Sequence, residues 1–165
     1  GPGTAPHLAG ELFSQLFKAD IVHVPYQSGG QAVTSLLSGE TQIYIAGLAV
    51  GKPHVESGRL RALAVAARNR FSSMPQLPTT SEAGHPEFLA SNWWGLAAPR
   101  STPVAVIQRI YTEFRTTLQE PSVRTRLDQQ GLIPSGIEPR AFSDLIEREA
   151  AAWKKVIESR KIRAN

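Results

Sequence analysis

The residues with the clearest chemistry stand at the start of the sequence, where a glycine-rich segment runs directly into a helical pattern. Gly1 and Gly3 leave the backbone open to close approach, and Thr4 is a suitable N-cap for a helix with Pro6 in its first turn. The first N–H groups of such a helix lack partners within it, and the helix dipole adds partial positive charge there. This stretch therefore predicts a seat for a carboxylate or a phosphate.

His7 lies in the first turn of this predicted helix, beside the anion seat. Its ring could donate a hydrogen bond to a carboxylate or simply pack against the helix, and the sequence leaves both readings open. The glycine segment itself also fits a tight connection, and Gly1–Pro2 fits the remnant of a cleaved expression tag. The segment lacks the Gly-Lys-Ser/Thr of a nucleotide P-loop and the complete dinucleotide fingerprint.

A second glycine loop follows at Tyr26–Gln31. Tyr26 ends a β-branched run there, where a phenol can both wall a pocket and donate a hydrogen bond. The loop lacks the first glycine of a Gly-x-Ser-x-Gly elbow and any evident base, so serine catalysis is not expected. No paired acids suggest glycoside chemistry. The sequence therefore predicts a binding protein rather than an enzyme.

Composition excludes several other classes of protein. The four histidines lie in separate segments without ligand spacing, and the chain has no cysteine, so neither a metal site nor a cofactor is expected. The net charge of +4 is carried by basic residues that alternate with acids on amphipathic segments, which does not predict nucleic-acid binding. No apolar run approaches the length that spans a membrane.

The elements that would position the two loops alternate between strand and helix. Strands are expected at residues 21–26, 41–46 and 60–66, and short helices at 31–37 and 50–56. Such an order is typical of parallel β-α-β units, in which ligands bind beyond the carboxyl ends of the strands. Both glycine loops lie at strand ends if a strand precedes Gly1.

The second half of the chain has a different character. Residues 68–90 are rich in Pro, Ser and Thr and predict a loop, and residues 93–99 predict a short apolar strand. Helices are then expected from Pro103, capped by Thr102, from Pro121 and from Pro139, each beginning at a proline. We place a lobe boundary near residue 90.

These segments resemble the extracytoplasmic solute receptors of tripartite tricarboxylate transporters, often called Bug receptors. The resemblance covers nearly the whole chain in family order, and it rests on Gly3-Thr4-x-x-His7-Leu8-Ala9-Gly10-Glu11, Val24-Pro25-Tyr26 with Gly29-Gly30 and Ala32, Leu36-Leu37-x-Gly39, Gly58-Arg59-Leu60-Arg61-Ala62-Leu63-Ala64-Val65, Pro78-Thr79-Thr80-x-Glu82-Ala83-Gly84, and Trp93-x-Gly95-Leu96-x-Ala98-Pro99 through Thr102-Pro103.

The resemblance implies an α/β fold of the type II periplasmic-binding-protein kind, with a parallel-rich sheet flanked by helices. Residues 1–90 would form the second, ligand-binding lobe. Residues 91–165 would supply a crossover strand and the C-terminal helices that complete a first lobe, which is missing here. Apolar stripes on those helices would then lack their cover. We therefore expect either that this chain alone self-associates, as a dimer for example, or that a cleaved first lobe has been lost.

In that family, backbone amides of the loop before this helix bind the ligand carboxylate, partly through ordered water. Carried over to this sequence, the candidate binding residues are Gly3, Thr4, Ala5 and His7 on one side, and Tyr26, Ser28, Gly29, Gly30 and Gln31 on the opposite wall.

The implied function is non-catalytic capture, in the periplasm, of a small carboxylate (a di- or tricarboxylate, an amino acid or an aromatic acid) for the membrane subunits of a transporter. A ligand-sensing module of the same fold, in a regulator or a two-component system, is the alternative. Gln27-Ser28 replaces a more usual basic residue and glycine, and Gln42-Ile43 stands where an Asp is common. These departures leave the identity of the solute open.

Overall fold

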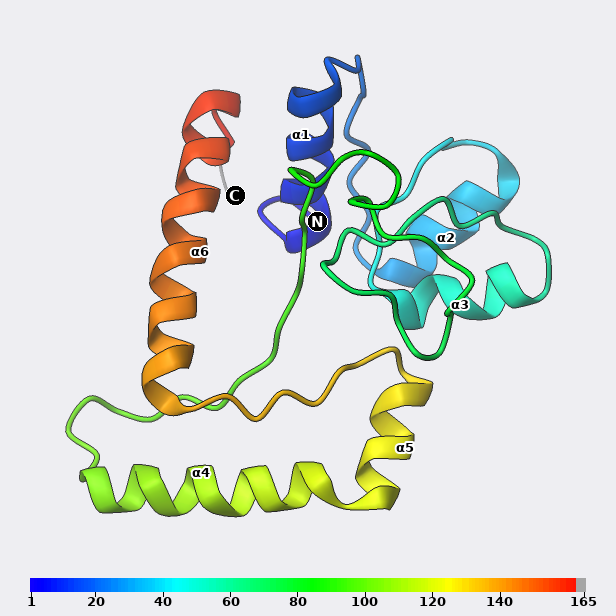
Figure 1. Cartoon of the computed structure of the whole chain (residues 1–165). Helices are drawn as coiled ribbons and strands as arrows, with labels where there is room; N and C mark the ends of the chain where they lie inside the picture. Colours follow the sequence, from blue (N-terminus) through cyan, green and yellow to red (C-terminus); the bar gives the residue numbers. More distant parts are fainter. Residues whose placement is uncertain (163–165) are drawn as a thin grey trace. The chain divides into compact units, whose positions relative to one another are not determined.

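The computed structural model describes residues 1–162, which divide into two compact units. The first unit comprises Gly1–Asn92 together with the chain from Ala152 onward, and the second comprises Trp93–Ala151. The long helix α6 (Pro139–Arg160) begins in the second unit and ends in the first (Figure 1). The last three residues of the predicted C-terminal segment, 163–165, lie outside the described range.

Three helices belong to the first unit, and their ends follow local sequence signals. Helix α1 (Ala5–Phe17) begins after Thr4, whose extended backbone makes it the N-cap. Helix α2 (Gly29–Ser38) begins after Ser28, whose Oγ accepts a hydrogen bond from the Gln31 N–H, and ends at Gly39 with φ of 80°. Helix α3 (Leu48–Glu56) follows. These positions confirm the three helices expected from the sequence.

The predicted sheet is not confirmed, because no strand is formed within residues 1–162. The only ladder contact there is a parallel bridge between Val65 and Thr79, in which the Val65 N–H donates to Pro78 O and the Thr80 N–H donates to Val65 O, both at 2.9 Å. The expected strands otherwise run as chain without sheet hydrogen bonds. A strand forms only beside a partner about 5 Å away, and no described segment offers one.

The expectation that residues 21–26 form a buried strand is wrong for this structure. Val22 is 81% exposed and Val24 is 46% exposed. His23 of this run stacks on His7, whereas the side chains of Val22 and Val24 find no cover among the described segments and remain in solvent. An apolar β-branched run predicts that a segment can form a buried strand, but it becomes buried only where another layer of the protein packs on it.

The core of the first unit lies under its long loop. Val65, Met74 and Leu77 are buried there, and the partly buried side chains that pack on them are Leu48, Val55, Ala62 and Phe71. The Pro-rich stretch 68–90 is irregular, as expected, but hydrogen bonds and an ion pair hold it in place. Arg70 Nε lies 2.9 Å from Glu82 Oε2, and the same oxygen accepts the Thr79 N–H at 2.7 Å.

Helix α1 packs through aromatic rings against Phe88, a buried residue of the long loop. Phe13 and Phe17 each meet Phe88 edge-on, with ring centroids 5.5 Å and 5.9 Å apart. The C-terminal part of α6 belongs to the same unit and buries Val156. The start of α1 is therefore anchored by apolar packing further along the helix, which leaves its N-terminal turn available for polar contacts.

The second unit contains α4 (Val104–Gln119), α5 (Pro121–Gln129) and the first part of α6. Pro121 and Pro139 open their helices as predicted, whereas the N-cap of α4 is Pro103 rather than Thr102. Trp93 packs edge-on against Phe142, with ring centroids 4.9 Å apart, and its Nε1 donates to Glu149 at 2.8 Å. These contacts join the start of the unit to α6.

Helix α4 has an apolar stripe without cover among the described residues. It has no buried residue, and Ile110 and Phe114 are 41% and 38% exposed. Val104 at its start is 83% exposed. This agrees with the expectation that the stripes of the C-terminal helices lack their natural covering layer.

Candidate functional site

The candidate site is the short loop that leads into α1. Gly3 has a φ of 73°, a conformation that side chains with a Cβ rarely adopt, and this glycine turns the chain into the helix. Thr4 holds the turn by donating from Oγ1 to Gly1 O at 2.7 Å, so its hydroxyl does not cap the helix. Pro6 stands in the first turn, where it has no N–H to satisfy.

The backbone N–H groups of Gly3, Thr4 and Ala5, which the sequence predicted to bind the ligand, differ in their hydrogen-bond partners. The Gly3 N–H donates to Nδ1 of His7 at 3.0 Å, and the Thr4 N–H donates to Gly1 O at 3.3 Å. The Ala5 N–H donates to no other residue within 1–162. In this conformation Ala5 therefore offers an open donor at the positive end of α1, and Gly3 offers one that is held by a side chain.

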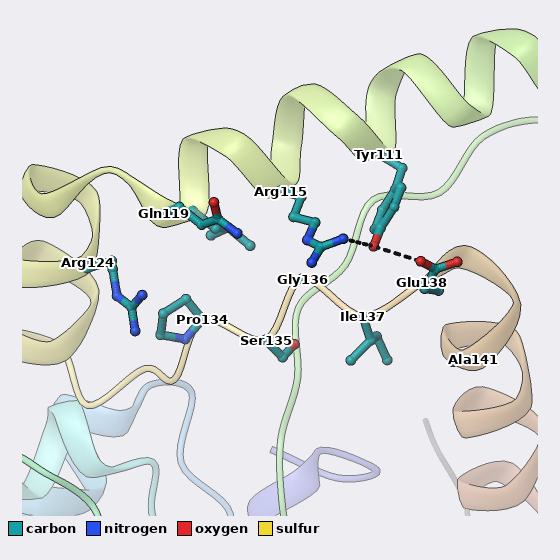
Figure 2. A pocket seen from close by; sticks show the side chains of 11 residues that line it. Tyr111, Arg115, Gln119, Arg124, Pro134, Ser135, Gly136, Ile137, Glu138 and Ala141 are labelled. Atoms are coloured by element: carbon teal, nitrogen blue, oxygen red, sulfur yellow. Dashed lines mark hydrogen bonds between the residues drawn. The ribbon is translucent and has the colours of Figure 1, made fainter.

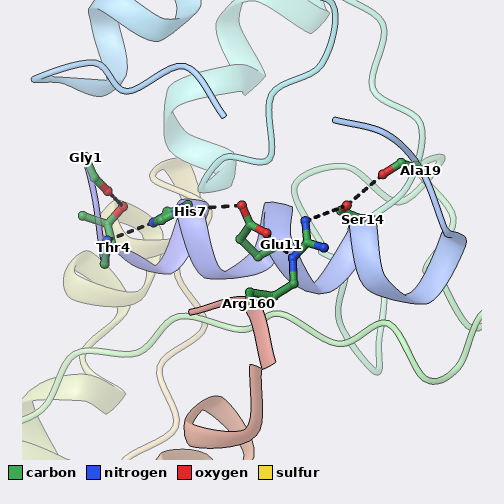
Figure 3. Close-up of polar contacts among 8 residues, drawn as sticks. Gly1, Thr4, His7, Glu11, Ser14, Ala19 and Arg160 are labelled. Atoms are coloured by element: carbon green, nitrogen blue, oxygen red, sulfur yellow. Dashed lines mark hydrogen bonds and ion pairs between the residues drawn. The ribbon is translucent and has the colours of Figure 1, made fainter. Parts of the chain in front are cut away.

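His7 connects this loop to a chain of charged groups (Figure 3). Its Nδ1 accepts from Gly3, so the proton of the neutral ring resides on Nε2, which lies 3.7 Å from Glu11 Oε1. Glu11 in turn accepts from Nε of Arg160 at 2.6 Å. The His7 and Glu11 side chains are only 11% and 16% exposed, so these contacts are shielded from water.

A second histidine ring lies flat against His7. The centroids of His7 and His23 are 3.8 Å apart and their planes differ by 12°. Burial, together with the charge that His7 can carry, lowers the pKa of His23 below its ordinary value, although Glu11 acts in the opposite direction. Two stacked imidazoles that both carry a positive charge would repel each other, so at most one of them is readily protonated.

Arg160 extends the network into α1. Its Nη2 donates to Ser14 Oγ at 3.1 Å, and Ser14 Oγ donates to Ala19 O at 2.8 Å. Of this network, only His7 was expected from the sequence to lie at the site, and Glu11, His23 and Arg160 were not. The spacing of four residues between His7 and Glu11 was a signal that could have been read. The contact to Arg160, 149 positions further along, had no local signal.

The second glycine loop uses its polar side chains mainly on itself. Ser28 Oγ accepts the Gln31 N–H at 3.3 Å, and Gln31 Oε1 accepts the Gln27 N–H at 3.1 Å, which together resemble a capping box. The Tyr26 hydroxyl is hydrogen-bonded to Ser35 Oγ. The N–H groups of Gly29 and Gly30 find no acceptor in the described part of the chain.

The two predicted loops lie next to each other. A Cβ placed on Gly1 would be 3.8 Å from Tyr26 O, which is ordinary van der Waals contact. The Tyr44 hydroxyl lies close to Gly29, 3.4 Å from the position that a Cβ on Gly29 would occupy. The backbone donors at the starts of α1 and α2 thus belong to neighbouring segments of one unit.

A cavity of about 510 Å³ lies in the second unit, lined by α4, α5, the segment before α6 and the first turn of α6 (Figure 2). Nη1 of Arg115 donates to the Tyr111 hydroxyl, and that hydroxyl donates to Glu138 Oε1, both at 3.3 Å. None of the predicted site residues lines this cavity. The sequence did not indicate a site here: Tyr111 and Leu118 belong to the apolar stripe expected on the helix that begins at Pro103.

Metal binding and membrane insertion find no support among the described residues. No group of three or more histidine, cysteine, aspartate or glutamate side chains within 1–162 is placed to hold a metal ion. No helix in that range combines the length and the apolar character needed to cross a bilayer.

Comparison with known proteins gives a consistent result. The family described as "Tripartite tricarboxylate transporter family receptor" matches residues 1–162. Protein BugT of Bordetella pertussis is 34% identical over 155 residues, which cover 94% of this chain and 48% of that protein. A protein encoded in the tcbD–tcbE intergenic region of Pseudomonas sp. is 32% identical over 166 residues, covering all of this chain and 49% of that protein.

Solved structures agree with the sequence relatives. Rpa4515 of R. palustris with adipate superposes with a TM-score of 0.83 at 32% identity, covering 97% of this chain and 54% of that one. MatC of Rhodopseudomonas palustris with bound malate superposes with a TM-score of 0.79 at 30% identity. The match covers 94% of this chain and 54% of MatC. The periplasmic binding protein BugD superposes with a TM-score of 0.75 at 23% identity, and the match covers 99% of this chain and 55% of BugD. At this level of identity it supports the fold alone.

Two conclusions follow from these comparisons. The neighbours are periplasmic binding proteins, so the architecture of this chain corresponds to part of that α/β fold. The chain spans about half the length of the curated relatives and solved structures named above.

Proposed function

Because this chain belongs to the receptor family of tripartite tricarboxylate transporters, we propose that it forms part of a receptor that captures a small carboxylate at the start of α1. The single observation that carries this proposal is the open Ala5 N–H at the positive end of α1, next to a glycine loop that lets an anion approach. The family comprises solute receptors and not enzymes, so capture without turnover is the activity it implies.

The class of ligand is supported by the neighbours. One relative of known structure contains adipate and another contains malate, and both are small dicarboxylates. A carboxylate is matched by main-chain N–H donors and a helix dipole, which together supply positive potential at the seat. Which member of this class binds here depends on the remainder of the pocket.

The proposed binding residues have distinct roles. Ala5 and Gly3 supply main-chain donors, Thr4 shapes the turn, and His7 places its Nδ1 at the edge of the seat. On the second loop, Gly29 and Gly30 supply open N–H groups. The side chains of Tyr26, Ser28 and Gln31 hold that loop in shape through the bonds described above, so their contribution to binding is to position its backbone.

The chain is proposed to contribute two functional segments to the complete receptor. Residues 1–90 would form the ligand-binding lobe, and residues 91–165 would complete the other lobe. The change of compact unit at Asn92, close to the proposed boundary, supports this arrangement, as does the uncovered stripe on α4. The complete receptor would act in the periplasm and deliver its ligand to membrane subunits of the transporter.

Isothermal titration calorimetry of the complete receptor against malate, adipate and a tricarboxylate tests the proposal. Saturable binding of at least one member of such a panel is the expected result. A matched panel of amides, in which each carboxylate is replaced by a neutral group, should show no binding. Absence of binding across a broad set of carboxylates would argue against the assignment.

A further inference from the structure

The bond between Gly3 and His7 places an acceptor where the ligand needs a donor. The Gly3 N–H has one hydrogen to give, and in this structure Nδ1 of His7 receives it at 3.0 Å. A carboxylate that takes this hydrogen would lie beside the lone pair of Nδ1. Two acceptors that face each other repel, so the neutral ring in this orientation opposes the anion.

A proton on Nδ1 reverses this relationship. The ring then has donors at both nitrogens, and Nδ1–H can bind the carboxylate oxygen that has replaced it on Gly3. Histidine is the side chain that exchanges a proton near neutral pH, so the change requires only a proton from the solvent. The carboxylate itself stays ionised; the one bond formed is Nδ1–H, made with a proton taken from the solvent.

The surroundings of the ring can accommodate the added charge. From within α1, Glu11 presents its carboxylate to Nε2 at 3.7 Å. From α6, Arg160 holds Glu11 at 2.6 Å and reduces its net negative charge. From the segment at residues 21–26, His23 stacks on the ring with centroids 3.8 Å apart.

Of these groups, His23 competes most directly for the proton. Burial lowers the pKa of His23, which therefore remains neutral near neutral pH. Glu11 is the counter-ion for an imidazolium at His7, and the bound carboxylate supplies a second negative charge on the opposite side of the ring. An imidazolium at His7 would therefore have a negative charge on each side when the seat is occupied.

We propose that capture of a carboxylate at the start of α1 takes up a proton at Nδ1 of His7, so that the ring changes from an acceptor of the Gly3 N–H into a donor to the ligand. This inference rests on the proposed function. It assigns Glu11 as a positioning residue that acts on the ligand through His7. Affinity for the carboxylate then rises as the pH falls, because the bound state holds more protons than the free state.

Calorimetry in two buffers that differ in ionisation enthalpy measures this proton uptake. The complete receptor is titrated with malate and with adipate in PIPES and in Tris, near neutral pH. The observed heat should depend on the buffer, and the slope should correspond to uptake of up to about one proton per ligand. Over the range above neutrality, the association constant should fall by at most about tenfold per pH unit.

Three variants test whether the proton taken up on ligand binding resides on His7. His7→Asn keeps an acceptor near the position of Nδ1 but cannot be protonated, so it should bind more weakly and without buffer dependence. Glu11→Gln removes the counter-ion at constant shape and should reduce the uptake. His54→Gln is the matched control, since His54 contacts Arg59 at the end of α3, and it should behave as the unmodified receptor.

The outcomes separate this inference from the function on which it rests. Binding with a heat that is independent of the buffer overturns the inference and leaves the function standing. Uptake that persists unchanged in His7→Asn assigns the proton elsewhere and also overturns the inference. Absence of any binding by the unmodified receptor overturns both.

Discussion

Arg160, the last residue of α6, donates through Nε to Glu11 of α1 at 2.6 Å, across 149 positions of the sequence. Glu11 is 16% exposed and Arg160 is 37% exposed, so the pair is partly screened by water. The contact ties the end of α6 to the helix whose first turn forms the candidate site. The support of the site thus comes from opposite ends of the chain.

Replacing Arg160 should therefore destabilise the first unit. Arg160→Ala removes charge-assisted bonds to Glu11 and Ser14, and we expect a loss of about 1–2 kcal/mol in the free energy of unfolding. Urea titration of the complete receptor measures it. Lys154→Ala is the control, because the Lys154–Glu158 pair is 72% and 65% exposed and should change stability by less than about 0.5 kcal/mol. Equal effects of the two substitutions would contradict the account.

Gly95 should be intolerant of any side chain. A Cβ on Gly95 would overlap Cζ of Phe142, so the ring must move. We expect Gly95→Ala to cost about 1–3 kcal/mol through overpacking, with part of the loss recovered when Phe142→Leu is added. Gly10→Ala is the matched control: nothing lies within 4 Å of its Cβ, and in the interior of α1 it should stabilise by up to about 1 kcal/mol. Destabilisation by both substitutions would show that the close contact is not the cause.

Glu82 should contribute a pH-dependent part of the stability of the first unit. Its hydrogen bond with Arg70, followed by that with the Thr79 N–H, lowers the pKa of Glu82 below the ordinary value of 4.5. A lowered pKa means that the contribution is complete above the ordinary value and is lost as the pH falls through the folded value. Thermal unfolding of the unmodified protein and Glu82→Gln should differ near neutral pH and converge in acid. A difference that grows on acidification would have the wrong sign.

Residues 1–165 prepared alone should self-associate. Val104, Ile110 and Phe114 present an uncovered stripe on α4, and apolar patches of this kind drive association in water. Light scattering after size exclusion should report a mass above that of a monomer, and Ile110→Lys should lower it. A compact monomer over a wide concentration range would contradict this expectation.

The sequence predicted the helices well because their signals are local. Ser28 and Gly39 delimit α2, and Pro121 and Pro139 begin α5 and α6, each through the properties of a few neighbouring residues. The strands were predicted from apolar β-branched runs, yet no strand forms within residues 1–162. A helix closes its hydrogen bonds within itself, whereas a strand depends on partners that a run such as residues 21–26 does not find among the described segments.

The same distinction applies to the candidate site. The turn at Gly3 and Thr4 and the placement of His7 at its edge followed from residues within one helical turn. The hydrogen bond from the Gly3 N–H to His7 Nδ1 could not be predicted, since it depends on the rotamer of the His7 side chain. The stack on His23 and the pair of Glu11 with Arg160 depend on which distant segments meet.

The central claim is that a main-chain donor at the start of α1 binds the ligand carboxylate. Ala5→Pro removes that N–H alone: Ala5 is the first residue of α1, where proline fits, and Thr4 already has the extended backbone that a following proline requires. Val104→Pro, at the first position of α4 in the other unit, is the matched control.

Calorimetric titration of the two variants and the unmodified receptor with malate and adipate is the decisive measurement. Loss of one charge-assisted hydrogen bond should weaken binding of the Ala5→Pro variant by about ten- to a hundredfold, and the Val104→Pro variant should bind as the unmodified receptor does. Unchanged affinity of a folded Ala5→Pro variant would show that the carboxylate is held elsewhere.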